Sequence, residues 1–449
     1  MLFDDPVFGS RVLTMITLSF HIIYATIGVG VPLMIMIAHW MGIKKNDDHY
    51  ILMARRWARG FAVTVAIGVV SGTAIGLQLS LLWPNFMELA GNIIALPLFM
   101  EVFAFFFEAI FLGIYAYTWD RFKDKRKHFL LLIPVVLGAM ASAVFITIVN
   151  AFMNSPQGFE LVNGQLINPN PIAAMFTPAM PTKVTHVLAT AYMTAAFLLA
   201  SIAAFQLVKG SKHVYHKKSL QLTMKVGLIF SIAAALIGDF SGKYLAEYQP
   251  EKLAAAEWHF ETEEGAPLLM YGILDEEGEV KYEIKIPFAL SILAFGNPNS
   301  EVIGLDQFPK EEIPPLIIHY FFDIMVTIGG FMVLLSLVYW IGIKRGWSFV
   351  SSKLYRWLIV LGGPLCFLAI EAGWWMAEVG RHPWILRGIM TIEAAATSSD
   401  YVGLMVILFG AVYLILGIGT IVVLRRMFKN NPVEFELEKR EATQGGETA

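Results

Sequence analysis

The sequence predicts an all-α integral membrane protein with nine transmembrane helices, its N-terminus outside and its C-terminus in the cytoplasm. The chain is 57% hydrophobic and only 15% charged, whereas soluble domains carry about 25% charged residues. Mostly apolar runs of roughly 20 residues, long enough to cross a bilayer core of about 30 Å, recur along it. Lysine and arginine gather in alternate connections between these runs.

We place the spans near residues 12–40, 58–83, 94–119, 129–152, 184–208, 220–241, 316–342, 354–378 and 400–425. Six spans therefore lie in residues 1–241 and three in residues 316–428. A long connection, residues 242–315, separates the two sets. Residues 429–449 are expected to form a polar cytoplasmic tail, and we expect its stretch "EFELEKREATQGGETA" to be disordered.

The basic connections set the direction of the spans. They carry Lys44, Lys45, Arg55 and Arg56; Arg121, Lys123, Lys125, Arg126 and Lys127; Lys209, Lys212, Lys217 and Lys218; Lys344, Arg345, Lys353 and Arg356; and, in the tail, Arg425, Arg426 and Lys429. Positive charge is retained in the cytoplasm, so the intervening connections are expected outside.

The connection at residues 242–315 is an acidic outer loop, with 15 Asp plus Glu against 5 Lys between 243 and 315. Long loops inside compact proteins are usually functional or disordered. We expect "KLAAAEWHFETEEG" to form a surface helix. The apolar stretch "IKIPFALSILAFG" is too short to span a membrane.

The cysteine count and the net charge exclude some kinds of site and give no sign of others. Cys366 is the one cysteine, which excludes an intrachain disulfide and a thiolate metal cluster. The net charge of −3 gives no indication of nucleic-acid binding, and no nucleic-acid partner is expected.

Ionisable groups inside apolar spans are costly and are by default candidates for function. His21 lies within the first span and His186 opens the fifth. His21 is either hydrogen-bonded to a neighbouring helix or a haem or metal ligand. His186, near the outer face, is either an interfacial histidine at a helix end or such a ligand. We interpret His39 and His319, at the ends of spans one and seven, as structural.

Two pairs of glutamates share a seven-residue spacing. Glu101 and Glu108 lie on one face of span three, about 10 Å apart along the helix. We favour a proton relay or ion site there over hydrogen bonding to other helices. Glu371 and Glu378 repeat the spacing on span eight, where Glu378 could simply be solvated at the helix end.

Taken with the direction of each span, His21, His186, Met325 and Glu378 all fall in the outer half of the membrane. By pattern alone Met325 is core packing. A shared depth nevertheless indicates a layer of cofactors, and His, Met and Glu with almost no Cys favour haem over zinc or iron–sulfur. A secondary ion or proton transporter would also explain the paired acids, and a non-catalytic membrane scaffold would leave them unexplained.

Four stretches carry a family resemblance. "GWWMAEVGRHPW", "SRVLTMITLSFHIIY", "FMEVFAFFFEAIFLGIYAYTWDR" and "KLAAAEWHFE" together resemble subunit I of cytochrome bd-type quinol oxidases. The resemblance covers nearly the whole chain, and the outer loop is similar to the short quinol-loop branch of Gram-positive bacteria.

The resemblance implies a low-spin haem b, a high-spin haem b and haem d in this subunit. His186 and Met325 match the axial ligands of the low-spin haem, which overturns the core-packing interpretation of Met325. His21 and Glu378 match the ligands of the other two haems, in an order that the sequence leaves open. Arg11, Trp374 and Arg381 match haem-proximal positions.

The resemblance also implies the activity and the partners. Lys252 and Glu257 match residues that act on quinol, so residues 242–315 are expected to be the quinol-binding loop. Glu101 and Glu108 match acids near the haem pair, on the path by which cytoplasmic protons reach dioxygen. A second large membrane subunit and a small single-span subunit are expected, in the bacterial cytoplasmic membrane.

Two positions depart from the family pattern. His382 stands where many relatives carry glutamine before "PW". Asp323 stands two residues before Met325, where some relatives carry arginine. An acid there should lower a haem potential or be protonated, which puts analogies about redox tuning in doubt.

Overall fold

The computed structural model describes residues 5–275 and 278–438. Within them, nine stretches are long and apolar enough to cross a membrane, as predicted. The helices that form them are α1 (Pro6–Lys45), α2 (Asp48–Leu82), α3 (Pro84–Tyr117), α4 (Lys125–Leu130) with α5 (Leu132–Asn154), α7 (Met180–Val208), α8 (Val214–Tyr248), α11 (Ile318–Arg345), α12 (Lys353–Val379) and α14 (Val402–Asn430).

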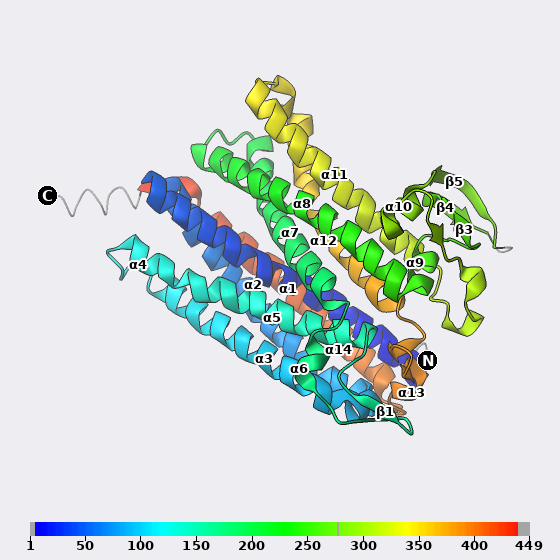
Figure 1. Ribbon diagram of the computed structural model, residues 1–449. Helices are drawn as coiled ribbons and strands as arrows, with labels where there is room; N and C mark the ends of the chain where they lie inside the picture. The colour runs from blue at the N-terminus through cyan, green and yellow to red at the C-terminus, as the bar shows by residue number, and fades with distance from the viewer. Residues whose placement is uncertain (1–4, 276–277, 439–449) are drawn as a thin grey trace.

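The spanning helices run side by side, and the two termini lie at opposite ends of the bundle (Figure 1). We call the end that holds Asp5 and residues 249–275 and 278–317 the loop end, and the end that holds Asn46 and Asn431 the tail end. α1 contacts α2, α5, α7 and α14, while α7, α8, α11 and α12 pack on one another. An odd number of spans accounts for termini at opposite ends.

Several helices are longer than predicted because hydropathy marks only their apolar part. α2 begins at Asp48, ten residues before the predicted boundary at residue 58. The Asp47 carboxylate caps it by accepting from the His49 backbone N–H at 3.0 Å. Asn46 ends α1 in the left-handed region, with φ of 49°. These two residues make a tight helical hairpin at the tail end.

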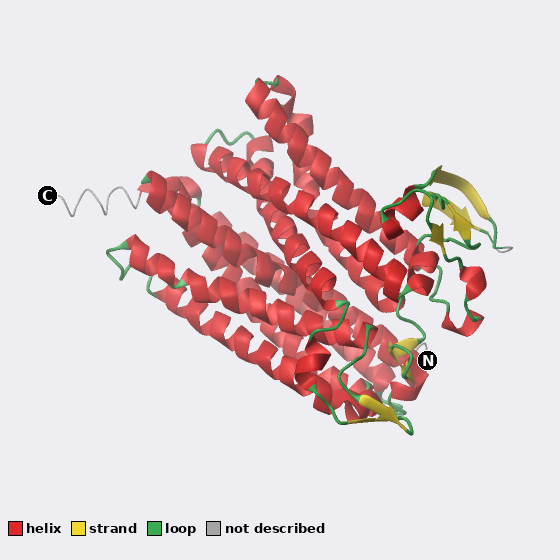
Figure 2. Ribbon diagram, viewed as in Figure 1, coloured by secondary structure: helices red, strands yellow, loops and turns green. Residues whose placement is uncertain are grey.

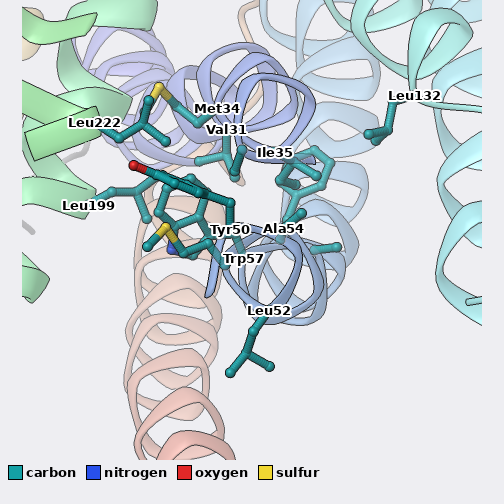
Figure 3. Close-up of a cluster of buried hydrophobic side chains, with 14 of the residues drawn as sticks. Val31, Met34, Ile35, Tyr50, Leu52, Ala54, Trp57, Leu132, Leu199 and Leu222 are labelled. Carbon is teal, nitrogen blue, oxygen red and sulfur yellow. The ribbon is translucent and has the colours of Figure 1, made fainter. Parts of the chain in front are cut away.

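Small residues let the helices approach closely, as is usual in membranes. A Cβ added at Gly30 of α1 would lie 2.4 Å from the Ala195 Cβ of α7, and one at Gly138 of α5 would lie 2.9 Å from the Ala104 carbonyl oxygen of α3. Towards the tail end, Met34, Ile35, Tyr50 and Trp57 form part of a buried apolar cluster (Figure 3).

The short elements lie at the loop end, where Figure 2 shows the strands. They are β1 (Glu160–Val162), β2 (Gln165–Ile167), α6 (Pro171–Met175), α9 (Pro250–Ala256), β3 (Glu263–Glu264), β4 (Leu268–Leu274), β5 (Val280–Ile286), α10 (Ala289–Phe295), β6 (Glu301–Val302), β7 (Trp384–Leu386), β8 (Met390–Thr391) and α13 (Ile392–Ala395), with 3₁₀ turns at Leu305–Gln307 and Lys310–Glu312. A further 3₁₀ turn, Ser348–Ser351, precedes α12 at the tail end. Each sheet is a two-stranded antiparallel pair. "IKIPFALSILAFG" does not span, as expected, but forms the end of β5 and α10.

The expected surface helix in "KLAAAEWHFETEEG" is wrong in two respects. Only α9 is helical, and Ala254, Ala255 and Ala256 are fully buried. The alanines pack beneath the loop against Ile318 and Met376, because small side chains allow the helix to lie flat on the bundle.

The expected disorder of the tail is wrong for its first residues. Arg56 and Arg59 of α2 lie 2.8 Å and 2.6 Å from the Glu436 carboxylate, and Val433 is buried. Ion pairs at the end of α2 therefore hold this segment. Residues 439–449 lie outside the described part of the chain.

Candidate functional site

The loop end of α12 holds a carboxylate surrounded by cations. Glu378 Oε2 lies 2.8 Å from Arg381 Nη2, and Oε1 accepts a hydrogen bond from the Asn150 amide of α5. Lys183 of α7 donates to Asn150 Oδ1 at 2.8 Å. The charges of Arg381, Lys183 and Lys252 all act on Glu378. One carboxylate facing three cations leaves an excess of positive charge.

Lys252 reaches this cluster from α9. Its side chain is buried, and Nζ donates to the Ala377 carbonyl at 2.8 Å. Burial, and then the charge of Lys183, hold the pKa of Lys252 well below its ordinary value. The charged form of this amine is therefore less favoured than that of an exposed lysine.

Glu257 ends α9 and faces a different neighbour. The side chain is buried, and neither carboxylate oxygen has a hydrogen-bond partner. Burial, followed by the charge of Asp323 on α11, raises the pKa of Glu257 well above its ordinary value. A buried carboxyl group without a protein partner can accept a hydrogen bond or proton from a ligand.

Two stacked aromatic rings, those of Trp258 and His319, follow Glu257 in the site. The Trp258 ring stacks on the His319 imidazole with centroids 4.1 Å apart, and Trp258 Nε1 donates to the Leu316 carbonyl at 2.8 Å. His319 Nδ1 lies 2.7 Å from the Ala256 carbonyl oxygen, and Nε2 lies 3.3 Å from Asp323 Oδ2. His319 thus joins α9 to α11, in keeping with the structural interpretation, while Asp323 faces His319.

His21 is held in one tautomer by α2. Its Nδ1 lies 2.9 Å from Ser71 Oγ, and the Ser71 hydroxyl donates to the Ile67 carbonyl at 2.9 Å. A Ser71 hydroxyl that donates to Ile67 would accept from Nδ1–H, and Nε2 would then carry no proton. An unprotonated Nε2 with a fixed Nδ1–H is the arrangement that an iron or metal ligand requires.

The depths of His21 and Glu378 follow from one hydrogen bond. Trp375 Nε1 of α12 donates to Ser19 Oγ of α1 at 2.9 Å. His21 lies two residues further from the loop end than Ser19, and Glu378 lies three residues nearer to it than Trp375. The two predicted ligands are therefore separated by about 7 Å along the bundle axis.

His186 and Met325 belong to the group formed by α7, α8, α11 and α12. His186 Nδ1 is buried without a hydrogen-bond partner, and a Cβ added at Gly238 of α8 would lie 3.8 Å from its Cε1. A Cβ added at Gly373 of α12 would lie 2.9 Å from Met325 Sδ. Gly238 and Gly373 thus allow the His186 ring to lie close to α8 and the Met325 thioether to lie close to α12.

Arg11 pairs with the residue that departs from the family pattern. Arg11 Nη2 lies 3.0 Å from His382 Nδ1. Burial, followed by the charges of Arg11 and Arg381, lowers the pKa of His382 to about 4. His382 is therefore neutral near pH 7 and accepts from Arg11, as a glutamine carbonyl could. Trp374 is half-buried on α12.

Glu101 and Glu108 share the face of α3 that packs on α5. Glu101 Oε1 accepts from the Ser142 hydroxyl at 2.9 Å. Glu108 is 4% exposed, and a Cβ at Gly138 would lie 3.0 Å from its Cβ. The two carboxylates lie along the seam between α3 and α5, at different depths and without contact between them. On α12, Glu371 is buried beside Ser19.

Sequence reasoning missed Lys183 and Asn150. A signal for Lys183 existed, because a lysine at the outer end of a span runs against the positive-inside rule. Asn150 is a polar residue inside an apolar span. Their connection to Glu378 could not be predicted, because it joins three helices that are distant in sequence.

The fold and this site define a multi-pass membrane protein whose charged and ligand-type side chains gather towards one end of the bundle. A model of the family described as cytochrome bd terminal oxidase subunit I matches residues 10–432. A putative cytochrome bd menaquinol oxidase subunit I of Bacillus subtilis is 40% identical, over 98% of this chain and 100% of that protein. A cytochrome bd ubiquinol oxidase subunit 1 of the same organism is 32% identical, over 89% of each.

The bd oxidase structure from Geobacillus thermodenitrificans superimposes with a TM-score of 0.93 at 64% identity, over 96% of this chain and 100% of that one. The chain belongs to the cytochrome bd terminal oxidase subunit I family. It is therefore a subunit of a quinol oxidase, and the family carries haem.

The residues at the loop end fit haem. His186 has a buried ring nitrogen without a partner. The His21 ring is oriented by the contact between Nδ1 and Ser71 Oγ, and the Met325 thioether lies against Gly373. Arg381 Nη1 is buried and has no hydrogen-bond partner, which suits a propionate. The histidine nitrogens and the methionine sulfur are possible iron ligands, and the arginine could pair with a haem propionate.

Proposed function

We propose that this chain is the haem-bearing subunit of a terminal oxidase in the bacterial cytoplasmic membrane. It oxidises quinol at the outer face and reduces dioxygen to water with protons taken from the cytoplasm. Oxidation and proton uptake then open to opposite sides, so proton motive force arises without a pump. The observation that carries the proposal is the gathering of partnerless or ligand-type groups and excess cations at the loop end.

His186 and Met325 are proposed as the residues that would hold the low-spin haem b. His21 and Glu378 are proposed to hold the high-spin haem b and haem d, in either order. When bound, the haems supply electron transfer and the reduction of dioxygen. Arg381 and Arg11 are proposed to compensate propionate charge, and Trp374 is proposed to lie near a haem.

Lys252 and Glu257 are proposed to bind quinol between α11 and α12. Lys252 would donate to one quinol oxygen, and the Glu257 carboxylate would take a proton from a quinol hydroxyl. Its raised pKa favours that transfer. The Trp258 ring, fixed by His319, provides an apolar surface for the quinol ring. The names of the relatives include both menaquinol and ubiquinol, so the proposal is a quinol without a choice between them.

Glu108 and Glu101 are proposed to conduct protons inward from the tail end along the α3–α5 seam. A partly buried carboxyl group can take up and release a proton with small rearrangement. Ser142 would orient Glu101. A second large membrane subunit and a small single-span subunit are proposed to complete the complex.

The test uses the whole complex in sealed vesicles of one orientation. Added quinol should drive oxygen consumption, with acidification on the loop side and alkalinisation on the tail side in equal amounts. Ion flux without oxygen consumption would favour the transporter suggested by the paired acids. Oxygen consumption with both pH changes on one side would contradict the assignment of the two faces.

A further inference from the structure

Part of the long loop lies beside the bundle. We call residues 268–275 and 278–296, which form β4, β5 and α10, the flank segment (Figure 1). Two contacts fix its depth. The Tyr271 hydroxyl is hydrogen-bonded to Thr327 Oγ1 of α11. Leu293 packs on Gly242 of α8, where an added Cβ would lie 2.7 Å from Leu293 Cδ1.

Both contacts lie below the helix ends. Thr327 is nine residues from the start of α11 at Ile318, which is about 13 Å along the axis. Gly242 is six residues from the end of α8 at Tyr248, about 9 Å along the axis. The flank segment therefore runs alongside the two helices, below their ends.

The flank segment exposes large apolar side chains. They are Ile273, Tyr282, Ile284, Phe288, Ile292 and Phe295, each at least 47% exposed. Exposed apolar residues of the two helices, Phe240 of α8 and Val326 of α11, continue the same kind of surface. Soluble proteins rarely leave such a surface in water.

Charges of the hairpin compensate one another. Lys281 Nζ lies 2.7 Å from Asp275 Oδ2, and Lys285 Nζ lies 2.9 Å from Glu283 Oε2. Paired lysines on long stems can keep their charged ends at the headgroups while their neighbours enter the apolar layer.

We propose that the flank segment is an interfacial membrane anchor. Its occupant is phospholipid: Ile273, Tyr282, Ile284, Phe288, Ile292 and Phe295 insert at the boundary between headgroups and acyl chains, in the leaflet at the loop end. Amphipathic segments enter this boundary by about 5–10 Å, and the contacts of Tyr271 and Leu293 hold the flank segment beside α11 and α8 rather than beyond their ends. The anchor would hold the loop on the membrane surface from which a membrane-soluble substrate arrives.

The first test measures access from water. In a Cys366→Ala background, Ile284→Cys is compared with Glu312→Cys, an exposed position of the same loop, and with Ile415→Cys on α14. The assembled oxidase is placed in vesicles of phosphatidylethanolamine and phosphatidylglycerol and treated with a membrane-impermeant charged maleimide. The thiol at 284 should react at least about tenfold more slowly than that at 312, the effect of a thiol pKa raised by one unit in apolar surroundings. Equal rates at 284 and 312 would overturn the proposal.

The second test identifies what covers the segment. Tyr282 is replaced by the photoreactive amino acid p-benzoylphenylalanine and irradiated in the same vesicles. A phospholipid adduct, found by mass spectrometry, is the expected result. A protein adduct would show that a subunit covers the face, and no lipid adduct would show that water does; either overturns the proposal. Normal haem content in the variants at positions 284 and 282 confirms that the complex has folded.

Discussion

At the residue scale, burial controls the carboxyl group proposed to receive the quinol proton. The raised pKa of Glu257 means that its proton-accepting carboxylate is scarce at low pH and increases as pH rises towards that pKa. Turnover limited by this step should therefore rise with pH in the range below it.

Glu257→Gln removes the acceptor but keeps the shape. We expect turnover to fall by about 100-fold, the usual contribution of a general base, and its rise with pH to disappear while haem content stays unchanged. Oxygen consumption measured across a pH series checks this, with the exposed Glu261→Gln as the control. A Glu257→Gln enzyme that kept the normal pH profile would exclude Glu257 as the acceptor.

Substitutions of two methionines on α11 can distinguish a haem ligand from a residue that only packs in the core. Met325→Leu keeps the volume but removes the thioether, so the low-spin haem b signal should be lost or converted to high spin. Met332→Leu, one heptad away and fully buried, should leave the reduced-minus-oxidised spectrum unchanged, because this exchange usually costs less than about 1.5 kcal/mol. Identical spectra for the two variants would refute Met325 as a ligand.

At the scale of elements, α3 supplies the proposed proton path. Glu108→Gln should slow dioxygen reduction by about 100-fold, within the range of proton-transfer groups, with haem content nearly intact. Glu88→Gln, an exposed position near the start of the same helix, should have no effect. Stopped-flow reaction of the reduced complex with oxygen isolates this step, and normal kinetics in Glu108→Gln would remove it from the path.

The α3–α5 seam also depends on a glycine. At Gly138 an added Cβ would lie 2.9 Å from both the Ala104 carbonyl oxygen and the Glu108 backbone nitrogen. Gly138→Ala should destabilise the complex by about 1–3 kcal/mol, as overpacking does. Gly113→Ala on α3 has open space around the new methyl group and should not. Thermal denaturation followed by haem release compares them, and equal midpoints would contradict such close packing.

The elements also show what the sequence could predict. All nine spans in the described residues were found because hydrophobicity in a membrane is a strong signal. The ends of the helices were not predicted, because the helices continue past the apolar run into polar sequence. The helix α2, for example, begins at Asp48 after its cap Asp47. Residue type and depth singled out His21, His186 and Glu378 as candidates, while Met325 was proposed as a ligand only through the family resemblance. The helix α9 was expected on the surface because its alanines give no signal of burial. The link from Lys183 through Asn150 to Glu378 exists only after three helices have packed together.

At the scale of the whole molecule, charge asymmetry and site placement point in opposite directions along the bundle. Basic residues flank the tail end, where Arg56 and Arg59 hold Glu436, and the positive-inside rule predicts that this end is cytoplasmic. The predicted ligands and quinol residues lie towards the other end. Electrons would therefore enter near one face while protons for water cross from the other, which is what charge separation without a pump requires.

The central claim is that this chain carries haems that quinol reduces. The direct measurement is the visible absorption spectrum of the purified complex, before and after anaerobic addition of quinol. The account predicts haem b absorbance together with a long-wavelength chlorin band from haem d, all reduced by quinol and reoxidised on admitting air. A colourless complex, or haems that quinol leaves oxidised, would contradict it.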